Sequence, residues 1–232
     1  MQFNPTFYRV AGVASIVSAV TTLMLIFLPK FFPAVDGFDA RMQLVDDPAY
    51  VLRSWAYLIH PFLAMTAALG VAMRIRRDAS AAAVVGLLGF LLWGCTEAAQ
   101  QTMTLFAFDK WRVAYAAADE LMRAQIRVNA AMYDGLWDAM YFLLLLGFTV
   151  GNTSFGVALA RRGQGLTRII GFFFFGAVAV TIPNILREIH WPTLSGPLEF
   201  WSYPAIQPLG RTLIGVWLWR FADESKPWSR PA

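Results

Sequence analysis

The sequence contains little charge and a single cysteine. Charged residues make up 15% of its 232 residues, whereas a soluble domain carries roughly 25%. The lone Cys95 excludes a disulfide framework and a cysteine-based zinc site within one chain. The sequence also has no Walker loop, no His-Glu-x-x-His pair and no nucleophile elbow, so nothing indicates nucleotide hydrolysis, zinc proteolysis or hydrolase chemistry. Because paired Glu-x-x-His motifs are missing too, we expect no metal site.

Apolar residues are abundant instead, and they are grouped in long runs. They make up 58% of the sequence, and six runs reach the roughly 20 helical residues that cross a bilayer. The first run exceeds the ~7–15 apolar residues of a signal peptide, so we expect it to be retained. We predict an all-α integral membrane bundle in which residues 1–232 form one transmembrane domain. Its six spans are expected at about residues 8–28, 50–73, 81–106, 130–160, 166–186 and 201–221.

Lysine and arginine are distributed unequally between the two ends of these spans. The end that holds both termini carries 10 basic residues, including Arg9, Lys226 and Arg230, and the opposite end carries 7 among many acidic ones. Because basic loops stay in the cytoplasm, we expect both termini to be cytoplasmic. Topology therefore explains the net charge of +4, and we expect membrane lipids rather than nucleic acid as partners.

The connection at residues 109–129 is long and has a helical pattern. Leu121, Met122 and Ile126 give it an apolar stripe beside two arginines. Such a segment either lies along the membrane interface or extends the third and fourth spans outward. The sequence leaves both arrangements open.

Three short segments carry a resemblance to a known family. Val157–Gly176 reads VALARRGQGLTRIIGFFFFG, Tyr8–Gly12 reads YRVAG, and Gly210–Phe221 reads GRTLIGVWLWRF. The pattern resembles an uncharacterised bacterial six-helix membrane family, a domain of unknown function. The resemblance implies a multi-pass protein of the bacterial inner (cytoplasmic) membrane, and it carries no catalytic residues over to this chain.

Polar side chains inside the predicted spans are the strongest functional signal, because a charged group there costs ~2.5–3.5 kcal/mol on insertion scales. They occur in five of the six spans. With the orientation above they fall in the outer half, apart from Arg211 near mid-span. This pattern predicts one polar site inside the bundle, reached from the outer face. Its residues are His60, Glu97, Gln101, Asp134, Asp138, Tyr141, Asn184, Gln207 and Arg211.

We assign the carboxyl groups of this set to catalysis. Glu97 is predicted to be the general acid and Asp138 the base, with Asp134 beside it. Three carboxylates exceed the charge of Arg53 and Arg211, so we predict that Glu97 holds a proton at neutral pH. The predicted substrate-binding residues are His60, Gln101, Tyr141, Asn184, Gln207 and Arg211. The sequence identifies no cofactor.

Structural interpretations of the same residues stay open. The two aspartates could form an ion-pair network with Arg211 that only joins helices, and Glu97 could be an interhelical hydrogen-bonding group. His60 could cap a kink at Pro61. Arg53 could extend to the outer surface.

Three functions fit the sequence. The first is binding, and conversion by acid–base chemistry, of a small lipophilic molecule, for example by an isomerase or cyclase. The second is proton- or cation-coupled transport. The third is a non-catalytic subunit or assembly factor that packs on a membrane-protein partner.

Overall fold

The structure, a computed structural model, describes residues 4–33, 36–190 and 197–222, with the backbone alone at 197–203. This described part is helical and contains no strand, which confirms the predicted all-α class. Five helical segments are long and apolar enough to cross a membrane, as expected of a multi-pass membrane protein. They are Pro5–Phe31, Pro48–Ile75, Ser80–Ala117, Glu120–Arg162 and Leu166–Glu188.

Six long helices form the bundle, and capping residues fix where several of them begin. The Asn4 side chain accepts a hydrogen bond from the Phe7 amide at 2.9 Å. Asp47 and Asp119 cap two further helices in the same way, which satisfies amide groups that the first turn leaves unpaired. The long helices are α1 (Pro5–Phe27), α3 (Pro48–Ile75), α4 (Ser80–Met103), α6 (Glu120–Arg162), α7 (Leu166–Glu188) and α8 (Pro197–Arg220).

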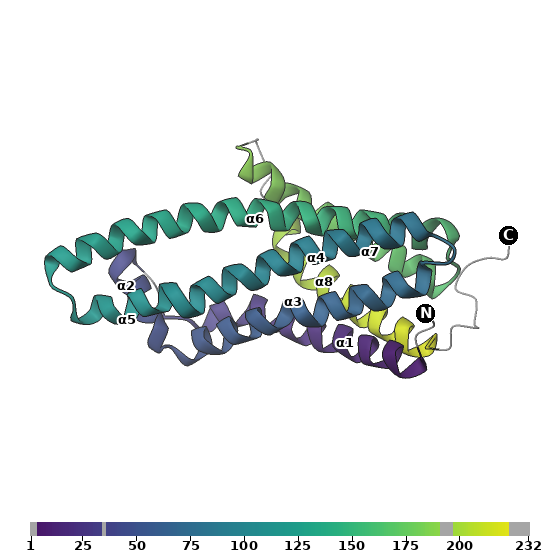
Figure 1. Cartoon of the computed structure of the whole chain (residues 1–232), viewed down its shortest axis with the longest axis horizontal. Helices are drawn as coiled ribbons and strands as arrows, with labels where there is room; N and C mark the ends of the chain where they lie inside the picture. The colour runs from purple at the N-terminus through teal and green to yellow at the C-terminus, as the bar shows by residue number, and fades with distance from the viewer. Residues whose placement is uncertain (1–3, 34–35, 191–196, 223–232) are drawn as a thin grey trace.

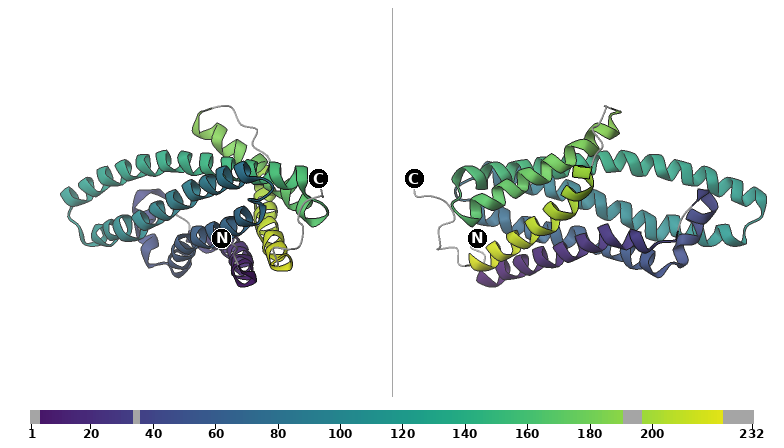
Figure 2. Two further views of the ribbon diagram at one scale, coloured as in Figure 1. Left: turned by 45° about the vertical axis from the view of Figure 1, so that its right-hand side comes forward. Right: turned by 180° about the vertical axis from the view of Figure 1, so that it is seen from behind.

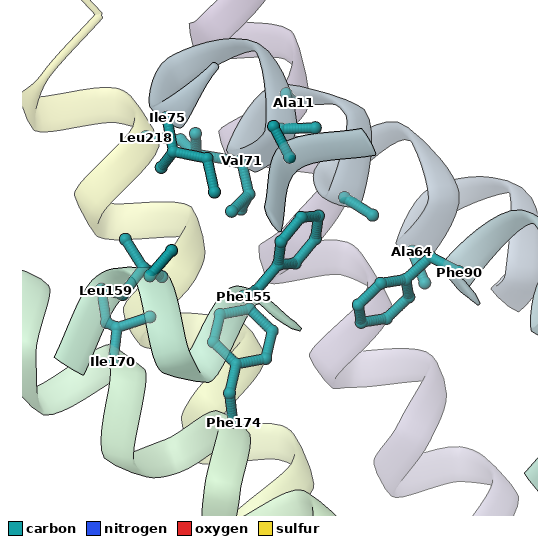
Figure 3. Close-up of a cluster of buried hydrophobic side chains, with 14 of the residues drawn as sticks. Ala11, Ala64, Val71, Ile75, Phe90, Phe155, Leu159, Ile170, Phe174 and Leu218 are labelled. Carbon is teal, nitrogen blue, oxygen red and sulfur yellow. The ribbon is translucent and has the colours of Figure 1, made fainter. Parts of the chain in front are cut away.

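The six helices pack as a ring in the order α1, α3, α4, α6, α7, α8, with α8 returning to α1 (Figures 1 and 2). The start of α1 and the end of α8 lie at the same end of the bundle, where the Arg9 guanidinium lies 5.9 Å from the Trp219 ring centroid. Of the basic residues predicted at this end, Lys226 and Arg230 lie outside the described residues. Apolar side chains from all six helices fill this half of the ring, among them Ala11, Val71, Phe90, Phe155, Phe174 and Leu218 (Figure 3).

The α4–α6 hairpin is much longer than a membrane span. At ~1.5 Å per residue, α6 is about 64 Å long, roughly twice the ~30 Å hydrocarbon core of a bilayer. The hairpin has two arms, of which α6 is one. The other arm consists of α4, a π-helical turn, η3 (Thr104–Phe108), and α5 (Asp109–Ala117). Residues 109–129 therefore extend the two helices beyond the rest of the bundle. This is one of the two arrangements that the sequence left open.

A second, smaller core stabilises the far end of this hairpin, which we call the tip. The short helix α2 (Gly37–Gln43) packs against α5 (Figure 1). Of the predicted apolar stripe, Ile126 is buried whereas Leu121 and Met122 are exposed. The buried residues of the tip core are Met42, Phe108, Tyr115, Ile126 and Ala130.

Polar contacts tie α2 to both arms of the hairpin. Arg41 donates two hydrogen bonds to the Asp134 carboxylate, at 3.0 and 2.7 Å. Since both side chains are about 40% exposed (39% and 41%), the pair should contribute at most ~1 kcal/mol. On the other side of α2, the Tyr115 hydroxyl donates to Asp39 at 2.5 Å and accepts from Arg127 at 2.7 Å.

We expect the tip to loosen in acid through Asp39. The hydrogen bond from Tyr115, aided by Arg127, holds the pKa of Asp39 below its usual value. Because the folded-state pKa is the lower one, this contribution is complete above the unfolded-state pKa of about 3.9 and is lost as pH falls through the folded-state pKa. Hydrogen exchange of the α2 amides, corrected for the intrinsic rate, should therefore accelerate below about pH 4. Asp39→Asn should reduce that pH dependence, and an identical profile in both proteins would contradict the assignment.

Candidate functional site

A cavity of about 360 Å³ lies inside the ring, in the half nearer the tip. Its size falls in the lower part of the ~300–1,000 Å³ range of small-molecule sites. All six long helices contribute to its wall, which combines apolar and polar side chains. The lining residues are Thr22, Leu25, Ile26, Arg53, Tyr57, His60, Trp93, Glu97, Tyr141, Leu144, Leu145, Phe148, Val180, Thr181, Asn184 and Arg211. We call it the central cavity.

Trp93 of α4 organises the inner end of the central cavity. Its ring packs edge-on against His60, with centroids 5.9 Å apart, and contacts the tilted ring of Phe148 at the same centroid distance. The Arg211 guanidinium lies 5.6 Å from the same ring, within the range of a cation–π contact. Since Glu97 follows Trp93 by four residues, helical geometry places both on one face of α4. Trp93 thus holds a histidine and an arginine next to a carboxyl group.

His60 is buried and hydrogen-bonded to α1. Its Nδ1 lies 2.7 Å from Thr21 Oγ1, and that hydroxyl lies 3.0 Å from the Ser18 carbonyl oxygen. In the tautomer that carries its proton on Nδ1, His60 donates to the Thr21 hydroxyl, which in turn donates to the Ser18 carbonyl. His60 Nε2 is then left with its lone pair, as a proton acceptor. Pro61 follows directly and supplies no amide hydrogen to α3.

Glu97 is 4% exposed, and its carboxyl lies in the cavity wall. It makes no hydrogen bond or ion pair with any residue of the described chain. Arg211 and Tyr141 are close enough to interact with it electrostatically, and Arg211 acts on His60 as well. A buried polar group without a hydrogen-bonding partner is uncommon in folded proteins. Such a group, facing a cavity, is available to a bound molecule.

Hydrogen bonds between α4 and α6 close the central cavity toward the tip. Gln100 donates to the Trp137 carbonyl at 2.8 Å. One turn further on, the hydroxyls of Thr104 and Tyr133 lie 2.6 Å apart. The lining includes no residue of α4 beyond Glu97.

The structure brings five of the nine predicted site residues together in the central cavity: His60, Glu97, Tyr141, Asn184 and Arg211. The other four lie elsewhere. Asp134 pairs with Arg41 at the tip, not with Arg211, and Asp138 is exposed and does not line the cavity. Gln101 is buried but does not line the cavity, and Gln207 lines a smaller pocket deeper in the bundle. The predicted base and its neighbouring carboxylate are therefore separated from Glu97.

Sequence reasoning missed other lining residues. Tyr57 and Thr22 lie one turn from His60 and from Ser18 on their helices, so the polar face of each helix could have indicated them. Trp93 was missed because an aromatic residue in a span gives no functional signal. Arg53, for which the sequence left extension to the outer surface open, is half-buried and lines the central cavity.

The described residues contain no cluster of three or more histidine, cysteine, aspartate or glutamate side chains that could hold a metal ion. Comparisons with known protein families, with curated protein sequences and with solved structures found no match to this chain. The candidate site therefore has to be interpreted from its own chemistry.

Proposed function

We propose that the central cavity binds a small lipophilic molecule and isomerises it by proton transfer. The observation that carries this proposal is the unpartnered carboxyl of Glu97, buried in a cavity wall that also holds the imidazole of His60. In the tautomer with its proton on Nδ1, His60 presents the Nε2 lone pair as the acceptor. An acid and an acceptor on different helices of one cavity are the two groups that such a reaction needs.

The proposed reaction is balanced within the site. Glu97 donates a proton to the first carbon of a double bond in the ligand, which leaves the positive charge on the second carbon, and His60 Nε2 removes a proton from the third carbon, which is bonded to the second. The double bond shifts by one position, and the ligand gains and loses one proton each. The proton on His60 then returns to Glu97. In this proposal His60 takes the role of base that the sequence had suggested for Asp138.

The membrane setting belongs to the same proposal. The protein has six spans, with α8 as the sixth, in a bacterial inner membrane, and both termini are cytoplasmic. The common end of α1 and α8 supports this orientation (Figure 1). The packed apolar half between the central cavity and that end (Figure 3) favours a one-sided binding site over a transport path.

The test compares the molecules that two variants retain. Wild-type protein and Glu97→Gln are purified gently, and organic extracts of both are examined by mass spectrometry. Glutamine keeps the shape and hydrogen bonding of a neutral carboxyl but cannot donate a proton as an acid. We therefore expect wild-type extracts to contain two isomers and Glu97→Gln extracts to contain one.

Asp138→Asn is the matched control, because it removes a carboxylate from exposed α6 surface outside the cavity. Its extract should match that of the wild type. If wild type and Glu97→Gln retain the same molecules in the same ratio, the catalytic proposal fails. Recovery of a stoichiometric protein partner with no small molecule would favour the subunit function instead.

A further inference from the structure

A second cavity, of about 330 Å³, lies in the tip. Its wall comes from α2, α5, α6 and the single turn η2 (Leu44–Asp46) that precedes α3. The described residues that line it are all different from those that line the central cavity. We call it the tip cavity, and the helices of its wall can be followed in Figure 1.

Arg112 of α5 lines the tip cavity and has one unused edge. Its side chain is 5% exposed, and its Nη1 donates to the Tyr50 hydroxyl and, at 2.9 Å, to the Asp109 carboxylate. Neither the buried Nε nor Nη2 makes a hydrogen bond with the described residues. These two nitrogens form one edge of the planar guanidinium group, and such an edge binds two oxygen atoms of an anion side by side. Because a buried donor without a partner is uncommon, this edge is suited to an anionic group of a ligand.

Two further side chains of opposite charge line the tip cavity without meeting each other. Arg123 of α6 lies 5.4 Å from the Tyr115 ring and forms no ion pair with the described residues. Asp46 of η2 is exposed and makes neither a hydrogen bond nor an ion pair with them. A molecule with one anionic and one cationic group pairs with both, whereas a singly charged molecule leaves one of them unpaired. Both signs are present whatever the net charge of the lining, so the tip cavity is suited to a zwitterion.

A mostly apolar groove continues from the tip cavity toward the membrane-spanning part of α4. Val45 and Val113 line both spaces, and the groove, of about 300 Å³, also reaches Leu105 of η3. The next residue, Phe106, is exposed, and its ring packs edge-on against the exposed Trp55 of α3, with centroids 6.2 Å apart. Exposed aromatic side chains of this kind are typical of the interface between a membrane and water. The groove thus leads from a charged cavity to a surface suited to lipid.

We propose that the tip cavity binds the headgroup of a zwitterionic phospholipid, an ester of phosphate with ethanolamine, from the adjoining membrane surface. The phosphate accepts hydrogen bonds from the unused edge of Arg112 and pairs with Arg123. The ammonium donates to the Asp46 carboxylate. The acyl chains leave along the groove, past Val113 and Leu105. This site is distinct from the central cavity and does not rest on the function proposed there.

The test titrates delipidated full-length protein in a non-ionic detergent and counts the bound molecules by native mass spectrometry. The first probe is dihexanoyl phosphatidylethanolamine. Dihexanoyl phosphatidylglycerol has the same chains without the ammonium, and glycerophosphoethanolamine has the same headgroup without the chains. We expect the ethanolamine lipid to bind at one site per chain. The other two probes should bind at least about tenfold more weakly, because each lacks one set of contacts.

Variants locate the binding. Arg123→Gln should weaken the binding of both lipids, whereas Asp46→Asn should weaken that of the ethanolamine lipid alone and so remove the preference for it. Ala116→Trp fills the tip cavity and should abolish binding. Asp46 and Ala116 are exposed, so these variants should fold normally, which thermal unfolding checks. Two exposed residues of α6 outside the tip cavity give the matched controls Arg161→Gln and Asp138→Asn, which should bind like the wild type.

Several results would overturn the inference: equal affinity for the two lipids, no binding of the ethanolamine lipid, or wild-type binding by Asp46→Asn, by Arg123→Gln or by Ala116→Trp. If glycerophosphoethanolamine binds as tightly as the ethanolamine lipid, the ligand is a soluble zwitterion and the assignment to a lipid is refuted. None of these measurements involves Glu97. The failure of the proposed function is therefore read separately, from identical extracts of wild type and Glu97→Gln.

Discussion

Gly89→Leu is expected to abolish the folded bundle. A Cβ atom at Gly89 of α4 would lie 2.4 Å from the Gly151 amide nitrogen and 2.8 Å from the Gly147 carbonyl oxygen. These are backbone atoms of α6, so no rotamer change can relieve the overlap, and the helices must move apart. Close approach of this kind holds membrane helices together mainly by packing. Because α4 and α6 form the longest interface of the ring, the cost should exceed the ~1–3 kcal/mol of ordinary overpacking.

The measurement is the yield of monodisperse protein after detergent extraction, followed by thermal unfolding of whatever remains. Gly89→Ala should give an intermediate loss, because its single methyl group meets the same backbone atoms. Gly135→Ala is the control on α6, since a Cβ there meets no atom within 4 Å. Alanine is favoured over glycine inside a helix by up to ~1 kcal/mol, so this variant should be neutral or more stable. A wild-type melting temperature for Gly89→Leu would show that the two helices are not held by this contact.

The helices themselves could be predicted from the sequence, because a run of apolar residues is a local property. The predicted spans 81–106 and 130–160 correspond to the apolar parts of α4 and α6. The hairpin tip depends on contacts between distant residues. Arg41 meets Asp134 across 93 positions of the chain, and no periodicity in either segment indicates that pairing.

The site was predictable where depth alone decides which residues meet. Glu97 and Tyr141 were predicted at a common level on two helices, so the order and direction of the spans were sufficient to group them, and Arg211, predicted near mid-span, reaches the same cavity. Depth does not determine which way a side chain faces. Asp138 lies one turn from Tyr141 but is exposed and does not line the cavity, because the rotation of a helix is set by packing and not by its ends. Asp134 lies near the tip, where it pairs with Arg41 of α2.

Replacing Glu97 by methionine should stabilise the ligand-free protein, although it removes the group on which the proposed function depends. The Glu97 carboxyl is buried and makes no hydrogen bond within the described chain. A buried polar group without a partner costs ~1–3 kcal/mol, and methionine has a similar length with no such requirement. At ~2–4 °C per kcal/mol for a chain of this size, the melting temperature should rise by several degrees. Binding sites commonly reduce stability in this way.

Gln100→Met is the matched comparison, three residues away on the same helix and equally buried. Gln100 donates to the Trp137 carbonyl, but its Oε1 is buried without a hydrogen-bond partner, so the loss of the bond and the relief of the unpartnered oxygen oppose each other. The same substitution should therefore raise the melting temperature less at Gln100 than at Glu97. Thermal unfolding of both variants in ligand-free detergent solution measures the difference. If Glu97→Met melts below the wild type, the carboxyl already has a stabilising partner, and its availability to a ligand is disproved.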